Sequence, residues 1–220
     1  MRGAAILKGG STGGMIIESL TVGPFMENVF ILGCGETGEA AIIDPGAEAE
    51  SILERVESLG LTVKRIIGTH CHIDHVGAVQ EIREKTGAGF YIHRNELPLV
   101  ESYDYQCGIF GVRLGEKPVV DGFIEEGDII TVGNVEAGAL LTPGHSPGGL
   151  SFVAGDAVFA GDTLFAGSIG RTDLPGGSYD TLIRAIREKL LVLPAETRVY
   201  CGHGPETTIG REKWTNPFLV

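Results

Sequence analysis

The stretch Ile66–Val79, IIGTHCHIDHVGAV, places three histidines and one aspartate within six residues. It begins with an apolar, β-branched run, which is typical of a buried strand. His70 and His72 flank a single cysteine, so their rings can point the same way in an extended or tightly turned backbone. Asp74 and His75 follow where the strand gives way to a helix. Because zinc and similar divalent cations prefer imidazole nitrogen and carboxylate oxygen, this H-x-H-x-D-H pattern predicts a metal site rather than a capped loop.

Three further residues of the same chemical kind follow later apolar runs. His145 comes after ALLTPG, Asp162 after AVFAG and His203 after RVYCG. Each lies next to a glycine, which permits a close approach of the backbone. Taken singly, each could be an ordinary turn residue. Together with the first cluster they use five of the six histidines in the chain and leave only His93, which is predicted to be a surface or helix-start residue.

Seven ligands are too many for one tetrahedral zinc, which uses three protein ligands and a water in a catalytic site. They suit two divalent cations, predicted to be zinc, with iron or manganese as alternatives. The predicted ligands of the first cation are His70, His72 and His145. Those of the second are Asp74, His75 and His203. Asp162 is predicted to bridge the two, because a carboxylate can bridge two cations whereas an imidazole must first lose its proton.

The order of apolar segments predicts an α+β fold. Short β-branched runs bounded by glycine or polar residues predict strands, whereas apolar residues at helical spacing predict helices. The predicted strands are 14–22, 28–34, 39–46, 62–70, 89–93, 128–133, 135–144, 149–155, 157–165 and 197–204. The predicted helices are 47–60, 75–87, 178–193 and, as a helix or turn, 206–216; residues 102–122 are predicted to be a loop-rich insertion. A group of strands followed by helices therefore occurs twice along the chain. This order fits two sheets packed face to face, with helices on the outer face of each sheet.

Composition limits the classes of partner. The 220 residues carry a formal charge of −12, which disfavours nucleic acid, and no apolar run approaches the roughly 20 residues that span a bilayer. The four cysteines are scattered without a C-x-x-C pair, so reduced thiols in a cytoplasmic protein are expected. Residues 1–14, rich in glycine, are predicted to be a flexible leader or a cloning remnant, and 15–220 one domain. The oligomeric state stays open.

Four stretches of the sequence together resemble the metallo-β-lactamase superfamily and, within it, the glyoxalase II-like (hydroxyacylglutathione hydrolase-like) enzymes. They are THCHIDHVGA at 69–78, TPGHSPGG at 142–149, GDTLFAGSIGRTDLPGG at 161–177 and CGHGPETTIGREKWTNPFL at 201–219. The resemblance implies an αββα sandwich of two mixed sheets, with two metals at one edge held in the partition given above. It also implies a short hydrolase, because the chain ends soon after His203, where glyoxalase II enzymes continue into a helical region that helps to hold glutathione.

The resemblance implies a metal-dependent hydrolase of small-molecule thioesters. Two cations would lower the pKa of a shared water, with Asp74 and Asp162 as the catalytic carboxylates beside the resulting hydroxide. A persulfide dioxygenase is the alternative, because that group resembles this chain and binds one iron at the positions of His70, His145 and Asp162. A lactonase and a non-catalytic metal-binding module are further alternatives. Because β-lactamases of this fold are expected to carry a cysteine at the position of Asp162, antibiotic hydrolysis is not predicted.

The substrate-binding residues are less distinct in the sequence. Arg171 is predicted to hold a carboxylate or thiolate, with a local ion pair to Asp173 as the alternative. Tyr103, Tyr105 and Phe110 are predicted to line a pocket, with anchoring of their loop as the alternative. Asp44, at the end of a strand, is predicted either to orient a ligand histidine or to cap the first helix.

Overall fold

Two six-stranded sheets form the centre of the computed structural model, which describes residues 14–220. In the first sheet the strands run in the order β1 (Met15–Val22), β2 (Glu27–Cys34), β3 (Glu39–Ile43), β4 (Thr62–Ile67), β5 (Gly89–Ile92) and β6 (Gly122–Phe123). In the second the order is β14 (Thr207–Thr208), β13 (Arg198–Cys201), β10 (Ala157–Gly161), β9 (Leu150–Ala154), β8 (Val135–Leu141) and β7 (Ile129–Val132). A small hairpin pairs β11 (Leu164–Phe165) with β12 (Ser168–Ile169).

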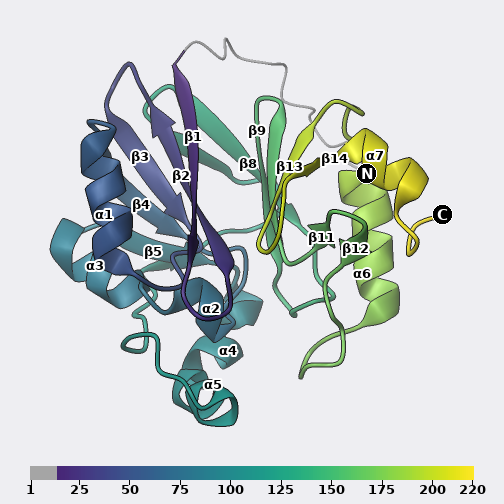
Figure 1. Ribbon diagram of the computed structural model, residues 1–220, viewed down its shortest axis with the longest axis horizontal. Coiled ribbons are helices and arrows are strands. Elements are labelled where there is room, and N and C mark those ends of the chain that lie inside the picture. Colours follow the sequence, from purple (N-terminus) through teal and green to yellow (C-terminus); the bar gives the residue numbers. More distant parts are fainter. Residues whose placement is uncertain (1–13) are drawn as a thin grey trace.

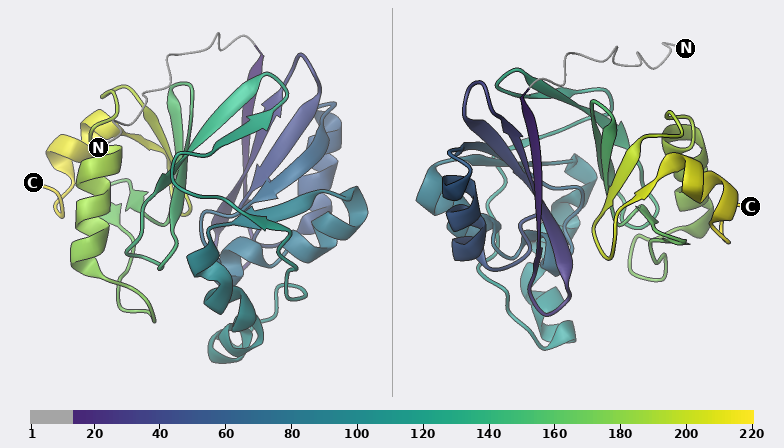
Figure 2. Two further views of the ribbon diagram at one scale, coloured as in Figure 1. Left: turned by 180° about the vertical axis from the view of Figure 1, so that it is seen from behind. Right: turned by 45° about the horizontal axis from the view of Figure 1, so that its top comes forward.

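Both sheets are mixed. In the first, β1, β2 and β3 pair antiparallel, whereas β3 through β6 pair parallel. In the second, β10 pairs parallel with β13 and the other pairs are antiparallel. The two sheets face each other, and helices cover their outer faces (Figures 1 and 2). The predicted αββα sandwich is therefore confirmed.

The alternation of side chains along each strand builds three apolar layers, because successive residues point to opposite faces of a sheet. In β3, Ala41 and Ile43 face the other sheet, whereas Ala40 and Ile42 face the helices. In β10, Phe159 likewise lies between the sheets while its neighbours pack outward. Such strands are buried on both faces, which is why they read as continuous apolar runs.

The helices divide between the two outer faces and one edge. The first sheet is covered by α1 (Ala49–Ser58) and α3 (Val79–Thr86). The second is covered by α6 (Tyr179–Ala185), which continues into the π-helical turn η2 (Ile186–Leu190), and by α7 (Ile209–Thr215). One edge of the sandwich carries three short helices, α2 (Ile73–Val76), α4 (Leu97–Glu101) and α5 (Tyr103–Phe110) (Figure 1). The 3-10 turn η1 (Arg94–Glu96) directly precedes α4.

Three predicted segments are wrong. The strand predicted over 157–165 is two strands, β10 and β11, which belong to different sheets. The helix predicted over 75–87 is interrupted after Val76, because Ala78 N donates to Pro45 O outside the helix; glycine at 77 lets the chain pass close to Gly46 O there. The insertion predicted as loop contains α5, whose apolar positions pack on the first core although its helical pattern is weak. The leader predicted over residues 1–14 lies, apart from Gly14, outside the described residues.

Strand ends from both sheets meet at the edge that carries α2. Leu150 N donates to Thr69 O across the sheets, and Gly202 N donates to Gly161 O. The β1–β2 loop reaches the same edge, where Asn28 N donates to Gly202 O at 2.8 Å. The chain segments that carry the predicted ligands are thereby held together by backbone hydrogen bonds.

Candidate metal centre

The H-x-H-x-D-H segment turns sharply after β4. His70 lies in the loop that follows the strand, and His72 is the extended N-cap residue of α2. Asp74 and His75 lie within the single turn of α2, and His75 N donates to His72 O at 3.0 Å. The loop and the short helix together turn all four side chains toward the edge between the sheets.

The three predicted ligands of the first cation lie together. His72 Nδ1 is 2.9 Å from His145 Nε2, and His145 Nε2 is 3.2 Å from His70 Nε2. One nitrogen from each ring lies within 4.8 Å of the other two. We call this cluster the three-histidine subsite.

The ligands predicted for the second cation also lie together. His203 Nε2 is 3.2 Å from Asp74 Oδ2, and His75 Nε2 is 3.9 Å from the same oxygen. We call this cluster, Asp74, His75 and His203, the aspartate subsite. Its side chains are more accessible, since 28% of His203 and 18% of Asp74 are exposed.

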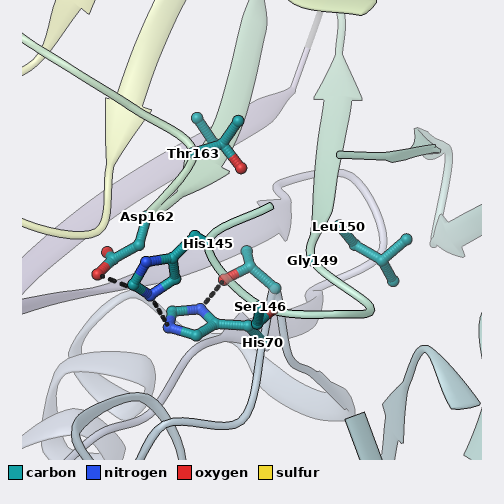
Figure 3. A pocket seen from close by; sticks show the side chains of 9 residues that line it. His70, His145, Ser146, Gly149, Leu150, Asp162 and Thr163 are labelled. Carbon is teal, nitrogen blue, oxygen red and sulfur yellow. Dashed lines mark hydrogen bonds and ion pairs between the residues drawn. The ribbon is translucent and has the colours of Figure 1, made fainter. Parts of the chain in front are cut away.

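Asp162 lies between the two subsites, as predicted for a bridging carboxylate. Its Oδ1 is 3.4 Å from His75 Nε2, and its Oδ2 is 3.5 Å from His145 Nε2 and 3.7 Å from His203 Nε2. Asp162 follows β10 directly, and a small cavity lined by His70, His145 and Thr163 adjoins it (Figure 3). One carboxylate thus faces histidines of both subsites.

Backbone carbonyls orient two of the rings. His145 Nδ1 lies 2.8 Å from Arg171 O, and His203 Nδ1 lies 3.3 Å from Met26 O. A carbonyl oxygen can only accept, so each Nδ1 carries the proton and each Nε2 presents a lone pair. The lone pairs therefore point into the two subsites.

Asp44 orients two more rings. Its carboxylate accepts from Thr69 N at 2.6 Å and from Thr69 Oγ1 at 2.5 Å, and it lies 3.2 Å from His75 Nδ1. The Thr69 oxygen is then left to accept from His70 Nδ1, 3.1 Å away. Asp44 thus contacts a predicted ligand histidine and does not cap α1, whose N-cap residue is Glu48.

The donor set fits divalent cations. With Nδ1 protonated on His70 and His145, two bare Nε2 lone pairs face each other at 3.2 Å, an arrangement that a cation between them would satisfy. His75 Nε2 and Asp162 Oδ1 are buried and have no hydrogen-bond partner among residues 14–220. Buried polar atoms normally have a hydrogen-bond partner, so these two atoms fit a role as cation ligands. Imidazole and carboxylate together suit zinc, iron or manganese.

The two subsites differ in electrostatics. Burial lowers the pKa of His70 and His145, and it lowers the pKa of His72 to about 3. These rings are neutral near pH 7 and can act as ligands. Burial also acts to lower the pKa of His75, but nearby carboxylates, Asp162 first, raise it well above its usual value. The aspartate subsite therefore holds negative charge that a positive group must balance.

The predicted substrate residues are dispersed. Arg171 forms a two-pronged ion pair with Asp173 at 2.7 and 2.6 Å, which is the local alternative. Tyr103 is fully buried and its hydroxyl donates to Gly115 O, so it anchors α5 instead of facing solvent. Tyr105 is 70% exposed, and Phe110 packs edge-on against Phe25. The roles of Arg171, Tyr105 and Phe110 toward a substrate stay predictions.

Some neighbours of the centre were not identified from the sequence. Glu27, at the start of β2, is buried and lies 3.7 Å from His75 Nδ1. Glu96, also buried, accepts from Cys71 N at 2.8 Å and thereby holds the loop between two ligands. His93 caps η1, as a helix-start residue, but is buried and not on the surface. An isolated acid beside an apolar run gives no pattern from which such contacts could be predicted.

The chain belongs to the metallo-β-lactamase superfamily, whose family model matches residues 22–203. It is 40% identical to the hydroxyacylglutathione hydrolase GloC of Haemophilus influenzae, over 93% of this chain and 98% of that protein. Among solved structures it is similar to TTHA1623 in a di-iron-bound form, at 42% identity and a TM-score of 0.85, covering 92% of this chain and all of the other. The fold and the paired clusters are thus those of a metallo-hydrolase superfamily that binds divalent metals.

A third similarity concerns the prediction against antibiotic hydrolysis. The chain is 35% identical to BLEG-1, described as a B3 metallo-β-lactamase, with a TM-score of 0.87 over 93% of this chain and all of the other. That this chain does not hydrolyse β-lactams stays a prediction. Separately, no helix within residues 14–220 is long and apolar enough to cross a membrane.

Proposed function

We propose that this protein is a dinuclear metal-dependent hydrolase of small-molecule thioesters, with 2-hydroxyacyl thioesters of glutathione or a related thiol as substrates. The observation that carries the proposal is the pair of adjacent histidine and carboxylate clusters that share Asp162. The similarity to GloC, named a hydroxyacylglutathione hydrolase, supports this choice of bond.

Two divalent cations bound here would supply Lewis acidity and lower the pKa of a coordinated water toward neutrality. The chain's own residues do the rest. Neutral rings of the three-histidine subsite offer lone pairs without carrying charge, and Asp162 fixes the spacing of the two subsites. Asp74, partly exposed beside His203, and Asp162 are the two carboxylates that would lie beside the coordinated water. The exposed side of the aspartate subsite is where a thioester would enter.

The direct test is thiol release. Purified protein reconstituted with zinc is incubated with S-lactoylglutathione and with acyl thioesters of other thiols, and free thiol is followed with a chromogenic reagent. We expect turnover of at least one 2-hydroxyacyl thioester. A lactone and a β-lactam are assayed in the same panel. Turnover of either one, with every thioester left intact, would contradict the proposed thioester hydrolysis.

A persulfide dioxygenase is the second candidate, because His70, His145 and Asp162 also form a two-histidine, one-carboxylate cluster of the kind that holds a single iron (Figure 3). Iron-loaded protein is mixed with glutathione persulfide, and oxygen uptake is measured beside the thioester assay. Oxygen uptake without thioester hydrolysis would favour this activity.

A non-catalytic metal-binding module would use its cations to hold the fold. The three apolar cores contain none of the predicted ligands, so the fold has support of its own. We expect chelation to abolish hydrolysis while the far-ultraviolet circular dichroism stays within about a tenth of its starting value, as for a scaffold with its own core. Complete unfolding on chelation, together with no turnover of any substrate, would favour the binding module.

A further inference from the structure

Glu27 is a buried carboxylate without a hydrogen-bond donor. Its side chain is 1% exposed, at the first position of β2. Neither carboxylate oxygen accepts a hydrogen bond from any residue in 14–220. An unpartnered buried carboxylate is unfavourable: burial raises the pKa of Glu27 well above its usual value, and a nearby positive charge opposes that rise.

Two other buried glutamates show how the same fold treats a carboxylate that has a purely structural place. Glu212 accepts from Gly167 N, Thr207 Oγ1 and Asn216 Nδ2 at 2.6–2.8 Å. Glu96 accepts from the backbone at Cys71 and Gly148. Both side chains are as buried as that of Glu27, yet their oxygens are satisfied. Burial alone therefore does not explain Glu27.

Glu27 lies behind the ring of a predicted metal ligand. Its Oε1 is 3.7 Å from His75 Nδ1, while His75 Nε2, on the other side of the ring, faces Asp162 and Asp74. Gly46 lies beside Glu27 and Asp74: a side chain there would collide first with Asp74 O and would also come within 2.8 Å of Glu27 Oε2. The His75 Nδ1 proton thus has two carboxylates near it, Asp44 at 3.2 Å and Glu27 farther out.

The residues on either side of Glu27 hold the other side of the same subsite. Met26 O orients His203 through Nδ1, and the backbone of Glu27 forms a bridge with His203. Asn28 Nδ2 donates to Cys201 O at 3.0 Å and to Gly204 O at 2.9 Å. Three consecutive residues therefore support the aspartate subsite, and none of these hydrogen bonds goes to a histidine of the three-histidine subsite.

We propose that Glu27 is a positioning residue that raises the cation affinity of the aspartate subsite and leaves that of the three-histidine subsite unchanged. Its negative charge lies 3.7 Å from His75 Nδ1 and acts on the ring from beside Asp44, the carboxylate in closer contact with that nitrogen. The proposal rests on the metal centre of the proposed function. It adds that the metal-free protein carries Glu27 at a cost in stability, which cation binding offsets.

The test compares Glu27→Gln with the unchanged protein and with Glu212→Gln as the matched control. Zinc is titrated against a chromophoric chelator to obtain two dissociation constants, and unfolding of the metal-free proteins is measured in urea. For Glu27→Gln we expect one of the two zinc dissociation constants to rise about 10–100-fold. The urea midpoint of the metal-free variant should be unchanged or higher. For Glu212→Gln we expect unchanged dissociation constants and a lower urea midpoint, because the group that accepts three hydrogen bonds is no longer a charged carboxylate.

A double variant assigns the affected site. In a His203→Ala background, which lacks the aspartate subsite, Glu27→Gln should leave the remaining constant unchanged. Glu27→Asp, which keeps the charge, should retain affinity to within a few-fold. If Glu27→Gln does not fold, Glu27→Met takes its place; if neither folds without metal, Glu27 is structural and the proposal is wrong.

Unchanged constants in Glu27→Gln, or a weakened constant that persists in the His203→Ala background, would also overturn it. Failure of the proposed function gives a different result, since the unchanged protein would then bind fewer than two cations, or bind two and hydrolyse no thioester.

Discussion

The two subsites share one carboxylate but are supported in different ways. The three-histidine subsite is made of buried rings from both halves of the chain, and its orienting contacts come from Thr69 and from the backbone at Arg171. The aspartate subsite is partly exposed and is supported from the β1–β2 hairpin. Two cations bound by one protein would therefore differ in how firmly they are held, with the aspartate subsite the more exchangeable.

The largest effect is expected from Asp162→Ala, which removes the carboxylate that both subsites face. We expect metal content to fall from two equivalents to below one and hydrolysis to fall about a thousandfold or more, because several kcal/mol of charge stabilisation are lost. Elemental analysis and the thiol-release assay measure both. Asp156→Ala, in the exposed β9–β10 turn, is the control. Two equivalents retained in Asp162→Ala would contradict the bridging role.

The next effect separates the subsites. His203→Ala should lose one equivalent of metal and keep the cation of the three-histidine subsite, whereas His145→Ala should lose the cation of that subsite. Hydrolysis should fall at least about a hundredfold in both variants, since each loses one of two cations that act together. Oxygen uptake that survives in His203→Ala but not in His145→Ala would instead identify mononuclear iron chemistry. Loss of both cations in either variant would show that the subsites are not independent.

A smaller effect on both subsites is expected from Asp44→Asn. The change keeps size and tolerates the positive φ of 53° at this residue, because asparagine adopts left-handed backbone more readily than most residues. Both cation affinities should weaken about 10–100-fold, since Asp44 supports His75 directly and His70 through Thr69. The chelator titration measures both dissociation constants. Asp128→Asn, on the surface, is the control. A change in only one of the two constants would contradict the prediction that Asp44 supports both subsites.

The smallest effect is expected from Thr69→Val, which keeps the shape but removes the hydroxyl between Asp44 and His70. The affinity of the three-histidine subsite should fall about tenfold while that of the aspartate subsite is unchanged. Loss of the buried hydrogen bonds should also lower the free energy of unfolding by about 1–3 kcal/mol. The same titration and a urea unfolding curve check this, and weakening of the aspartate subsite alone would contradict the assignment of His70.

The architecture could be predicted because local sequence patterns indicate its strands and helices. Apolar runs such as those of β2 and β10 have the length and composition of strands buried on both faces. The seven predicted ligands could be found because each follows such a run, and strand ends from packed sheets meet at one edge. Where local patterns are weak the predictions are wrong, as in α5 and in the helix interrupted after Val76.

The sequence by itself determined the fold class and which side chains gather at the edge, because side-chain periodicity and glycine positions act over a few neighbouring residues. Only the tertiary structure decided how those side chains are oriented. Met26 O meets His203, and Asn28 meets Gly204, across more than 170 residues of chain. The tertiary structure likewise brings the unpartnered carboxylate of Glu27, in β2, close to His75, in α2. Such contacts depend on how two sheets and a short helix pack together, and no local pattern encodes that packing.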